Sequence, residues 1–282
     1  MTEGIADIRR RIRSVESTEH ITNAMRLVSA ARFRRAREQY DRTGAQLEEV
    51  LERMEPILGN VMAPQQSAER KLLVVMTSSR GLCGGYNSSI LKAAEEILDE
   101  DCSLYFMGAK GESYFKRKNR KTAGSMQEPA AGPKKGQDVF RNMKTASDTI
   151  LQEYLSGGAG EIWLVHTAYR NTLKQEPEVK RILPIETGAR CGPEEQEDRM
   201  EFEPERSKVQ AQLLPKYLQL ALYRAWLEAE ICEHAARRTA MESATDNARE
   251  MLSALSVKMN RARQQAITDE LIEIVSGAEA MR

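Results

Sequence analysis

A segment between residues 78 and 87 has the composition of a loop that could bind phosphate. It reads Ser-Ser-Arg-Gly-Leu-Cys-Gly-Gly-Tyr-Asn and lies between an apolar run and a stretch with helical character, which is where phosphate-binding loops occur. The segment contains neither GxxxxGK[ST] nor GxGxxG, the two patterns typical of nucleotide sites. We therefore favour a tight strand-to-helix turn, in which glycines supply unusual backbone angles and Asn87 caps the helix.

The histidines and cysteines show no pattern of a metal or redox site. His20, His166 and His234 lie far apart, without HExxH and without a carboxylate or cysteine at ligand spacing. The three side chains of a Ser-His-Asp triad need only meet in space, so the sequence alone does not exclude a triad, although nothing in it points to one. We expect no metal and no cofactor. The cysteines form no CxxC pair, and we expect free thiols in a reducing compartment; they are Cys83, Cys102, Cys191 and Cys232.

Charge is balanced over the whole chain but uneven along it. There are 42 basic and 42 acidic residues among 282, which argues against a nucleic-acid coat. Nine arginines lie between residues 9 and 37, where the only carboxylates are Glu16 and Glu19, whereas residues 48–55 are acidic. The arginine-rich stretch is either a solvated face or a surface for an acidic protein partner.

The sequence also argues against insertion in a membrane. No apolar run approaches the roughly 20 residues that span a bilayer. The N-terminus carries Glu3 and Asp7 and has no apolar segment, which argues against a signal or transit peptide. We expect a soluble chain that reaches a membrane only through partners.

Proline and glycine divide the chain into three parts. Residues 5–43 contain neither, and we expect a helix that continues past Gly44 and ends before Pro56, roughly 75 Å long. Residues 216–276, which follow Pro215, predict a second helix of roughly 90 Å. Helices of this length need another helix alongside them.

The apolar spacing in both long stretches indicates that they pair. In the first, Ile5, Ile8, Ile12 and Val15 recur at intervals of three and four, and after an offset Ile21, Met25 and Val28 resume the pattern. In the second the series is Leu252, Leu255, Met259, Ala262 and Ala266, followed by Ile267, Leu271, Ile274, Ala278 and Met281. This is coiled-coil spacing with irregularities. An antiparallel pair is the simplest arrangement for one chain; separate bundle helices are the alternative.

The middle of the chain predicts an α/β domain. Short apolar runs at 72–77, 104–107 and 162–167 are typical of buried strands, and helical segments at 88–98, 110–118 and 139–155 separate them. This alternation predicts βαβ units and a parallel sheet covered on both faces. Residues 126–137, rich in proline and glycine, predict a surface loop. The expected division is a helix over 1–56, an α/β domain over 71–205 and a helix over 206–282.

The C-terminal helix changes character near its end. Residues 260–268 carry polar groups, whereas from Leu271 onward the side chains are apolar and small. A free helix with that much apolar surface would aggregate, so we expect this end to lie inside a larger assembly.

In these residues the chain resembles the gamma subunit of F-type ATP synthases. Several motifs carry the resemblance in the right order over essentially the whole chain: Ser29-Ala30-Ala31, Arg80-Gly81-Leu82-Cys83-Gly84-Gly85, Glu233-His234-Ala235-Ala236-Arg237, Ala240-Met241, Ala244-Thr245-Asp246-Asn247-Ala248, Asn260-Arg261-Ala262-Arg263-Gln264, Ile267-Thr268 and Glu273-Ile274-Val275.

The resemblance implies a fold and a function. The fold would be an antiparallel coiled coil of the terminal helices with an inserted Rossmann-like α/β domain. The coiled coil would turn as a central-stalk rotor inside a ring of three alpha and three beta subunits, with the α/β domain near the epsilon subunit and the c-subunit ring. The beta subunits would carry out the ATP chemistry, and this chain, non-catalytic and present once per complex, would transmit torque at the cytoplasmic face of a bacterial plasma membrane.

The resemblance also implies five contacts with the beta subunits. Met25 matches a residue that faces an acidic beta-subunit loop, and Arg237 matches an arginine at that contact. A polar set engages a second loop and matches Arg263, Gln264 and Thr268. The fixed fork of donors on arginine suits a carboxylate partner.

The chain departs from the family at three positions. Ser79 stands where an aspartate is usual, Cys232 where serine is common, and Arg238 where methionine is usual. The paired-cysteine regulatory insertion of chloroplast relatives is missing, so we expect no thiol control of rotation.

Two other functions compete with this interpretation. A nucleotide-dependent enzyme would bind ATP tightly, but the phosphate-loop lysine is missing. An arginine-rich adaptor for nucleic acid or an anionic membrane would bind with a steep salt dependence, but the overall charge is balanced.

Overall fold

The computed structural model describes residues 5–59, 70–126, 136–171, 175–185, 202–203 and 205–280. Contacts divide the chain into two compact units, residues 1–30 with 237–282, and residues 31–236. Two long helices contribute to both units: α1 (Ile5–Leu58) and α6 (Arg206–Ala280). The division at 1–56, 71–205 and 206–282 therefore stays a prediction, since each long helix takes part in both units.

The long helices do not end where the prolines predict. Pro56 lies inside α1 and Pro215 lies inside α6, so both predicted limits are wrong. A proline inside a helix removes one backbone hydrogen bond. Packing offsets that cost here, because the neighbouring side chains Leu58, Leu214 and Leu218 are 3% exposed or less.

The larger unit contains a five-stranded sheet in the order β3-β2-β1-β4-β5. Its elements, besides parts of α1 and α6, are β1 (Lys71–Met76), α2 (Tyr86–Ile97), β2 (Ser103–Met107), α3 (Ala109–Lys116), β3 (Thr122–Met126), α4 (Gly136–Leu155), β4 (Glu161–Tyr169) and β5 (Gln175–Leu183). The first four strands are parallel, with Val74 opposite both Tyr105 and Leu164, whereas β5 runs antiparallel to β4.

The prediction of a wholly parallel sheet is therefore wrong at one edge, and two strands were not predicted. Both missed strands, β3 and β5, are edge strands with few buried side chains: in β5 only Ile182 and Leu183 are buried. Edge strands lack the continuous apolar run of a buried parallel strand. Within the predicted loop at 126–137, Met126 ends β3 and Gly136 begins α4, while residues 127–135 lie outside the described residues.

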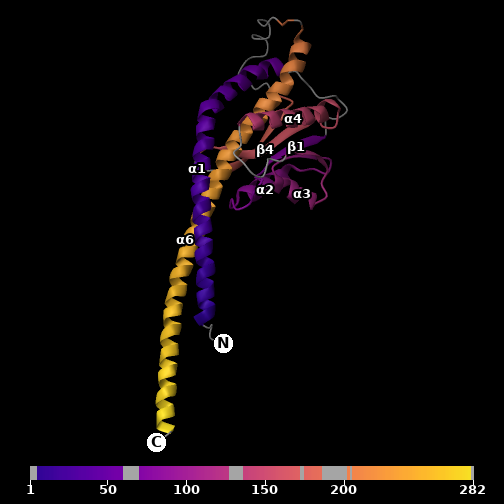
Figure 1. The fold of residues 1–282 in the computed structure, drawn as a ribbon. Helices are drawn as coiled ribbons and strands as arrows, with labels where there is room; N and C mark the ends of the chain where they lie inside the picture. The colour runs from indigo at the N-terminus through magenta and orange to yellow at the C-terminus, as the bar shows by residue number, and fades with distance from the viewer. Residues whose placement is uncertain are drawn as a thin grey trace. The chain divides into compact units, whose positions relative to one another are not determined.

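Successive residues of the central strands alternate between two cores. Leu72, Val74 and Met76 pack with α4 and with buried residues of α1 and α6. Leu73 and Val75 pack on the opposite face with α2 and with Phe115 of α3. The sheet is therefore covered on both faces, as expected, and α4 and the α2–α3 pair lie on opposite sides of it (Figure 1).

The cysteines of the described residues are buried free thiols. They are Cys83, Cys102 and Cys232, and Cys191 lies outside the described residues. Burial raises the pKa of Cys232 to about 12, so this thiol is protonated at neutral pH. None of the helices in the described part of the chain has an apolar stretch that could cross a bilayer.

One glycine is required where β2 approaches the end of β1. Gly108 follows β2 with φ of 105°, and an added Cβ would lie 2.0 Å from the carbonyl oxygen of Thr77. Both the dihedral angle and the contact exclude other residues, because a positive φ strains any side chain and the obstructing atom is backbone.

We predict that Gly108→Ala lowers the free energy of unfolding by about 3 kcal/mol. The measurement is denaturant unfolding followed by the fluorescence of Trp163 and Trp226, which both lie in this unit. Gly85→Ala is the control, because Gly85 has φ of −79° and its added Cβ would lie no closer than 3.8 Å to the Ser88 hydroxyl. Equal effects of the two substitutions would contradict this account.

Candidate partner interface

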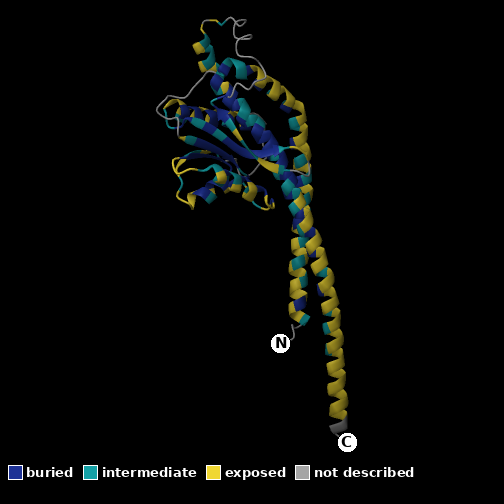
Figure 2. Ribbon diagram, turned by 180° about the vertical axis from the view of Figure 1, so that it is seen from behind, coloured by how far each residue is buried: buried dark blue, intermediate teal, exposed yellow. Residues whose placement is uncertain are grey.

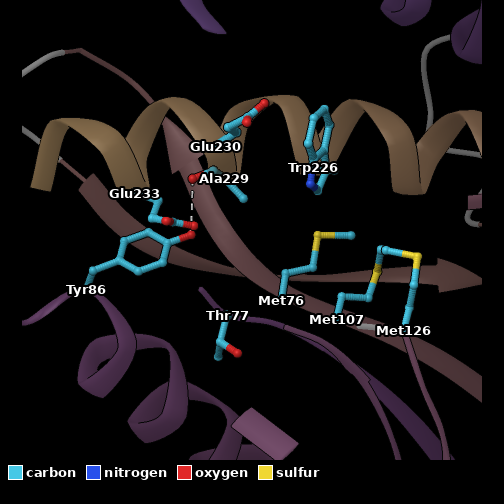
Figure 3. Close-up of a pocket in the computed structure, with 9 residues that line it drawn as sticks. All are labelled: Met76, Thr77, Tyr86, Met107, Met126, Trp226, Ala229, Glu230 and Glu233. Carbon is cyan, nitrogen blue, oxygen red and sulfur yellow. Dashed lines mark hydrogen bonds between the residues drawn. The ribbon is translucent and has the colours of Figure 1, made fainter. Parts of the chain in front are cut away.

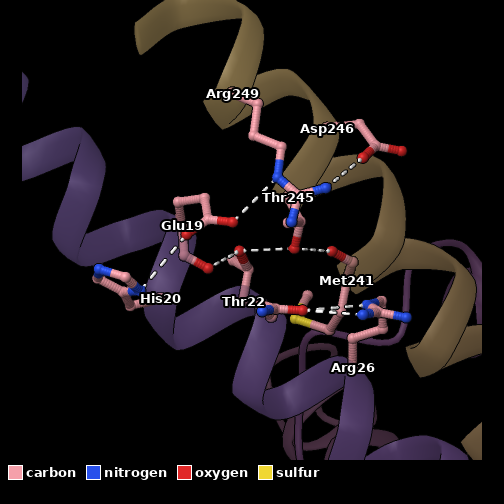
Figure 4. A network of polar contacts seen from close by, with 9 residues as sticks. Glu19, His20, Thr22, Arg26, Met241, Thr245, Asp246 and Arg249 are labelled. Carbon is pink, nitrogen blue, oxygen red and sulfur yellow. Dashed lines mark hydrogen bonds and ion pairs between the residues drawn. The ribbon is translucent and has the colours of Figure 1, made fainter.

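The smaller unit is an antiparallel pair formed by residues 5–30 of α1 and 237–280 of α6. At its centre the Thr245 hydroxyl lies 2.9 Å from that of Thr22, and Arg249 Nε donates to Glu19 at 3.1 Å. Moving back from 22 to 19 on one helix corresponds to moving forward from 245 to 249 on the other. The helices therefore run in opposite directions (Figure 4).

Burial follows an unbroken heptad pattern on both helices. On α1 the positions are 5, 8, 12, 15, 19, 22, 26 and 29, and on α6 they are 241, 245, 248, 252, 255, 259, 262 and 266, all buried or half-buried. Intervals of three and four keep one face of each helix turned towards its partner. This confirms a coiled coil.

The predicted offset in the apolar pattern of α1 is wrong. Ile21 is 57% exposed and Val28 is 54% exposed, so neither belongs to the seam. The seam continues instead through Thr22 and Ser29, which are 9% and 2% exposed. Sequence reasoning missed these positions because it followed apolar side chains, although the intervals of three and four pass through both.

Hydrogen bonds make these buried hydroxyls compatible with the seam. Thr22 Oγ1 donates to the Glu19 carbonyl oxygen at 3.0 Å and Ser29 Oγ to the Met25 carbonyl oxygen at 2.7 Å. Thr245 Oγ1 lies 2.7 Å from the Met241 carbonyl oxygen and 2.9 Å from Thr22 Oγ1. A buried hydroxyl without a partner is costly, so the bond between Thr22 and Thr245 favours this register over its neighbours.

The end of α6 continues beyond the paired region. In this register the start of α1 at Ile5 faces the turn of α6 around Ala262, and beyond that turn the described part of α1 provides no neighbour. The apolar side chains there are 51% to 67% exposed, namely Ile267, Leu271, Ile272, Ile274 and Val275. Figure 2 shows this exposed end of the helix. We call these five residues the apolar end.

The glycine-containing loop after β1 is held by its own side chains. Leu82 and Gly84 have positive φ, 64° and 57°. The backbone N–H of Ser78 donates to Asn87 Oδ1 at 3.0 Å, and Ser78 Oγ donates to the Arg80 carbonyl oxygen at 2.6 Å. The tight turn is confirmed, but the predicted capping role of Asn87 is wrong, because Gly85 is the N-cap and Asn87 lies within α2.

The carboxyl ends of the parallel strands are closed by side chains. Open α/β sheets bind ligands at this edge, but here Met76, Met107 and Met126 extend from β1, β2 and β3 towards Trp226 of α6 (Figure 3). Tyr86 closes one side by donating to the Ala229 carbonyl oxygen at 3.2 Å. The cavity left has a volume of about 20 Å³, which suits one water molecule. A nucleotide does not fit in it.

Comparison with known proteins identifies the family. A family model described as ATP synthase matches residues 4–281. The chain is 37% identical over 287 residues to the ATP synthase gamma chain of Moorella thermoacetica, with 98% of each chain covered. It is 35% identical over 294 residues to that of Alkaliphilus metalliredigens, with all of both chains covered. The chain belongs to the ATP synthase gamma-chain family.

Solved structures support the fold of this gamma-chain family member. A chain of the Euglena gracilis mitochondrial ATP synthase, in its OSCP/F1/c-ring structure, has a TM-score of 0.75 and 17% identity, with 98% of this chain and 94% of that chain covered. A chain of the Tetrahymena thermophila central stalk and c-ring has a TM-score of 0.59 and 21% identity, with 79% and 99% covered. These likenesses confirm the predicted fold of long terminal helices with an inserted α/β domain.

The structure places the five residues assigned from gamma subunits in two regions of the smaller unit. Met25 is half-buried on α1, and Arg237 is 7% exposed on α6. Arg263 and Gln264 are exposed within one turn of α6, and Thr268 donates its hydroxyl to the Gln264 carbonyl oxygen at 2.9 Å. The last three residues form a polar patch where the apolar end begins.

Two of the departures from the gamma-chain pattern lie in different environments. The Ser79 hydroxyl is buried and has no hydrogen-bond partner within the described part of the chain, in the loop where the family usually has a carboxylate. Arg238 is half-buried on α6, and nothing in the structure explains its presence.

The register of the helix pair can be tested by disulfide formation. We predict that Thr22→Cys with Thr245→Cys forms an intramolecular disulfide under mild oxidation, because the two side-chain oxygens lie 2.9 Å apart. Peptide mapping by mass spectrometry measures the product. Ile21→Cys with Thr245→Cys is the matched control, since Ile21 is 57% exposed and outside the seam. Equal oxidation of both pairs would rule out the register.

Proposed function

We propose that this chain is the central-stalk rotor of an F-type ATP synthase, coupling ion flow through a membrane ring to ATP synthesis or hydrolysis on beta subunits. The observation that carries the proposal is the apolar end, a stretch of α6 that extends beyond its partner helix and exposes five large apolar side chains. Exposed apolar surface of this kind marks a protein interaction site. A surrounding ring of subunits would cover all sides of such a helix.

Rotation would couple the two processes because the helix pair is asymmetric. Half of the seam positions on α1 are polar, whereas on α6 only Thr245 is. The helix α6 extends beyond α1, and different side chains face outward on each side. Each orientation inside a threefold ring would therefore stabilise a different conformation at each of the three surrounding sites. Coupling of this kind depends on differential binding between states, so this chain would be non-catalytic.

The exposed arginines of α1 support binding to an acidic surface on a partner subunit. Arg9, Arg10, Arg11 and Arg13 are exposed at one end of the helix, and Arg32, Arg34, Arg35 and Arg37 are exposed further along it. Exposed arginine donors suit carboxylate-rich loops. Met25 and Arg237 would form one contact with the beta subunits, and the polar patch of Arg263, Gln264 and Thr268 would form the other.

The remaining partners and the location follow from the family. The α/β domain, over about residues 71–205, would contact the epsilon subunit and the ring of c subunits. One copy would serve each complex of three alpha and three beta subunits, without binding nucleic acid. The similarity to gamma chains of two bacteria supports a place at the cytoplasmic face of a bacterial plasma membrane.

We predict that Arg263→Ala with Gln264→Ala lowers ATP synthesis by the assembled complex at least about tenfold. Hydrogen bonds to charged groups contribute about 1.5–3 kcal/mol, and both side chains are exposed. The measurement is ATP synthesis driven by an ion gradient in reconstituted vesicles. Ser256→Ala with Lys258→Ala, at exposed positions of the same helix, is the control. Unchanged ATP synthesis in the first double variant would contradict the assignment of Arg263 and Gln264 to a contact with the beta subunits.

A further inference from the structure

A second and larger cavity lies within the α/β unit, at the β4–β5 end of the sheet. Its volume is about 220 Å³, and α1, β4, β5 and α6 all contribute to its walls. Five of its lining residues are glutamates and two are permanent cations: Glu48, Glu52, Glu55, Glu178 and Glu228 against Arg224 and Lys180. The five carboxylates outnumber the two cations, so the lining carries an excess of negative charge, which favours a cationic ligand.

The guanidinium in the wall is already engaged. Arg224 Nη2 donates to Glu48 at 3.1 Å, and its Nε lies 3.5 Å from Glu228. Burial alone would raise the pKa of Glu228, but the hydrogen bond from His166 and the charge of Arg224 bring that pKa below its usual value. Glu228 is therefore an anion at neutral pH, and Arg224 is engaged with Glu48 and Glu228 rather than with Glu52 or Glu55.

A buried imidazole in the same wall has an unused nitrogen. His166 is 5% exposed, its Nε2 lies 3.6 Å from Glu228, and its Nδ1 has no hydrogen-bond partner among the residues that the structure describes. In the tautomer whose Nε2 proton faces Glu228, Nδ1 is an acceptor. A buried acceptor without a donor is costly, so this wall favours a ligand that donates hydrogen bonds.

The rest of the cavity lining consists of carboxylates and of apolar side chains. Glu52 is exposed, and Glu55 accepts a hydrogen bond from the Tyr217 hydroxyl at 3.2 Å. A carboxylate has capacity for several hydrogen bonds. Leu51, Leu164 and Ile182 add apolar surface to the same cavity.

We propose that this cavity binds an alkylammonium group, carried either by a free diamine or by a lysine side chain of a neighbouring protein. An ammonium has three donors and no acceptor, which matches carboxylates and an imidazole acceptor. Its methylene stem matches the leucine and isoleucine surface, in the way that lysine stems cover apolar surface elsewhere. Glu52, Glu55 and His166 receive the charged head.

The first test uses the full chain and 1,5-diaminopentane, which has the head and stem of lysine. Calorimetry is expected to show saturable binding, and a diamine concentration of ten times Kd raises the unfolding midpoint by about 3 °C. Glu52→Gln with Glu55→Gln is expected to weaken binding at least about tenfold. The control variant is Glu38→Gln with Glu49→Gln, at exposed positions of α1 outside the cavity, and it is expected to bind the diamine unchanged. Added salt at the ionic strength of the diamine solution is also expected to leave binding unchanged.

The second test separates the two sources of the ammonium group. In the complex isolated from native membranes, carbodiimide joins a carboxylate to a lysine that contacts it. A cross-link from Glu52 or Glu55 to a lysine of another subunit, found by mass spectrometry, identifies a protein side chain. Diamine binding to the chain without such a cross-link identifies a free diamine. The proposal is overturned if neither is found, or if the Glu52→Gln and Glu55→Gln pair binds diamine as the unaltered chain does.

Discussion

The antiparallel seam between α1 and α6 is the interaction on which the rest of the smaller unit depends. Helices of 54 and 75 residues are far longer than those that a globular core covers, so each requires a partner along its length. The seam meets this need with a heptad pattern whose centre is polar. Hydrogen-bonded threonines there favour one register, and that register leaves the apolar end of α6 without a neighbour.

A similar constraint governs the larger unit, where α1 and α6 again run side by side. Gln39 bonds to Tyr223, Glu55 to Tyr217 and Ile57 to Gln210, an antiparallel order like that in the smaller unit. The part of α6 around Trp226 covers the carboxyl ends of the strands and fills the usual ligand position of an α/β sheet. The sheet therefore has a structural role at that edge, and the open polar cavity lies elsewhere, beside β4 and β5.

Strong periodic signals explain which parts of the structure could be predicted from sequence. The apolar runs of β1, β2 and β4 and the intervals in α6 identify buried elements directly. The signal fails where an element is only partly buried, as in the edge strands β3 and β5. It also fails where buried side chains are polar, as at the seam positions Thr22 and Ser29. At Pro56 and Pro215, packing of the neighbouring residues overrides the helix-breaking tendency of proline. The cavity beside β5 could not be predicted, because its residues come from four elements and meet only in the fold. The contacts with beta subunits stay predictions, since they rest on positional resemblance.

The central claim, that this chain turns as a shaft, is tested most directly by single-molecule rotation. The assembled complex would be fixed to a surface through its beta subunits, and a bead would be attached to a cysteine introduced at the exposed position of Lys144 on α4. With ATP present, this account predicts one-directional rotation of the bead, with three pauses in each turn. A bead that stays still, or only fluctuates, while the same particles hydrolyse ATP would contradict it.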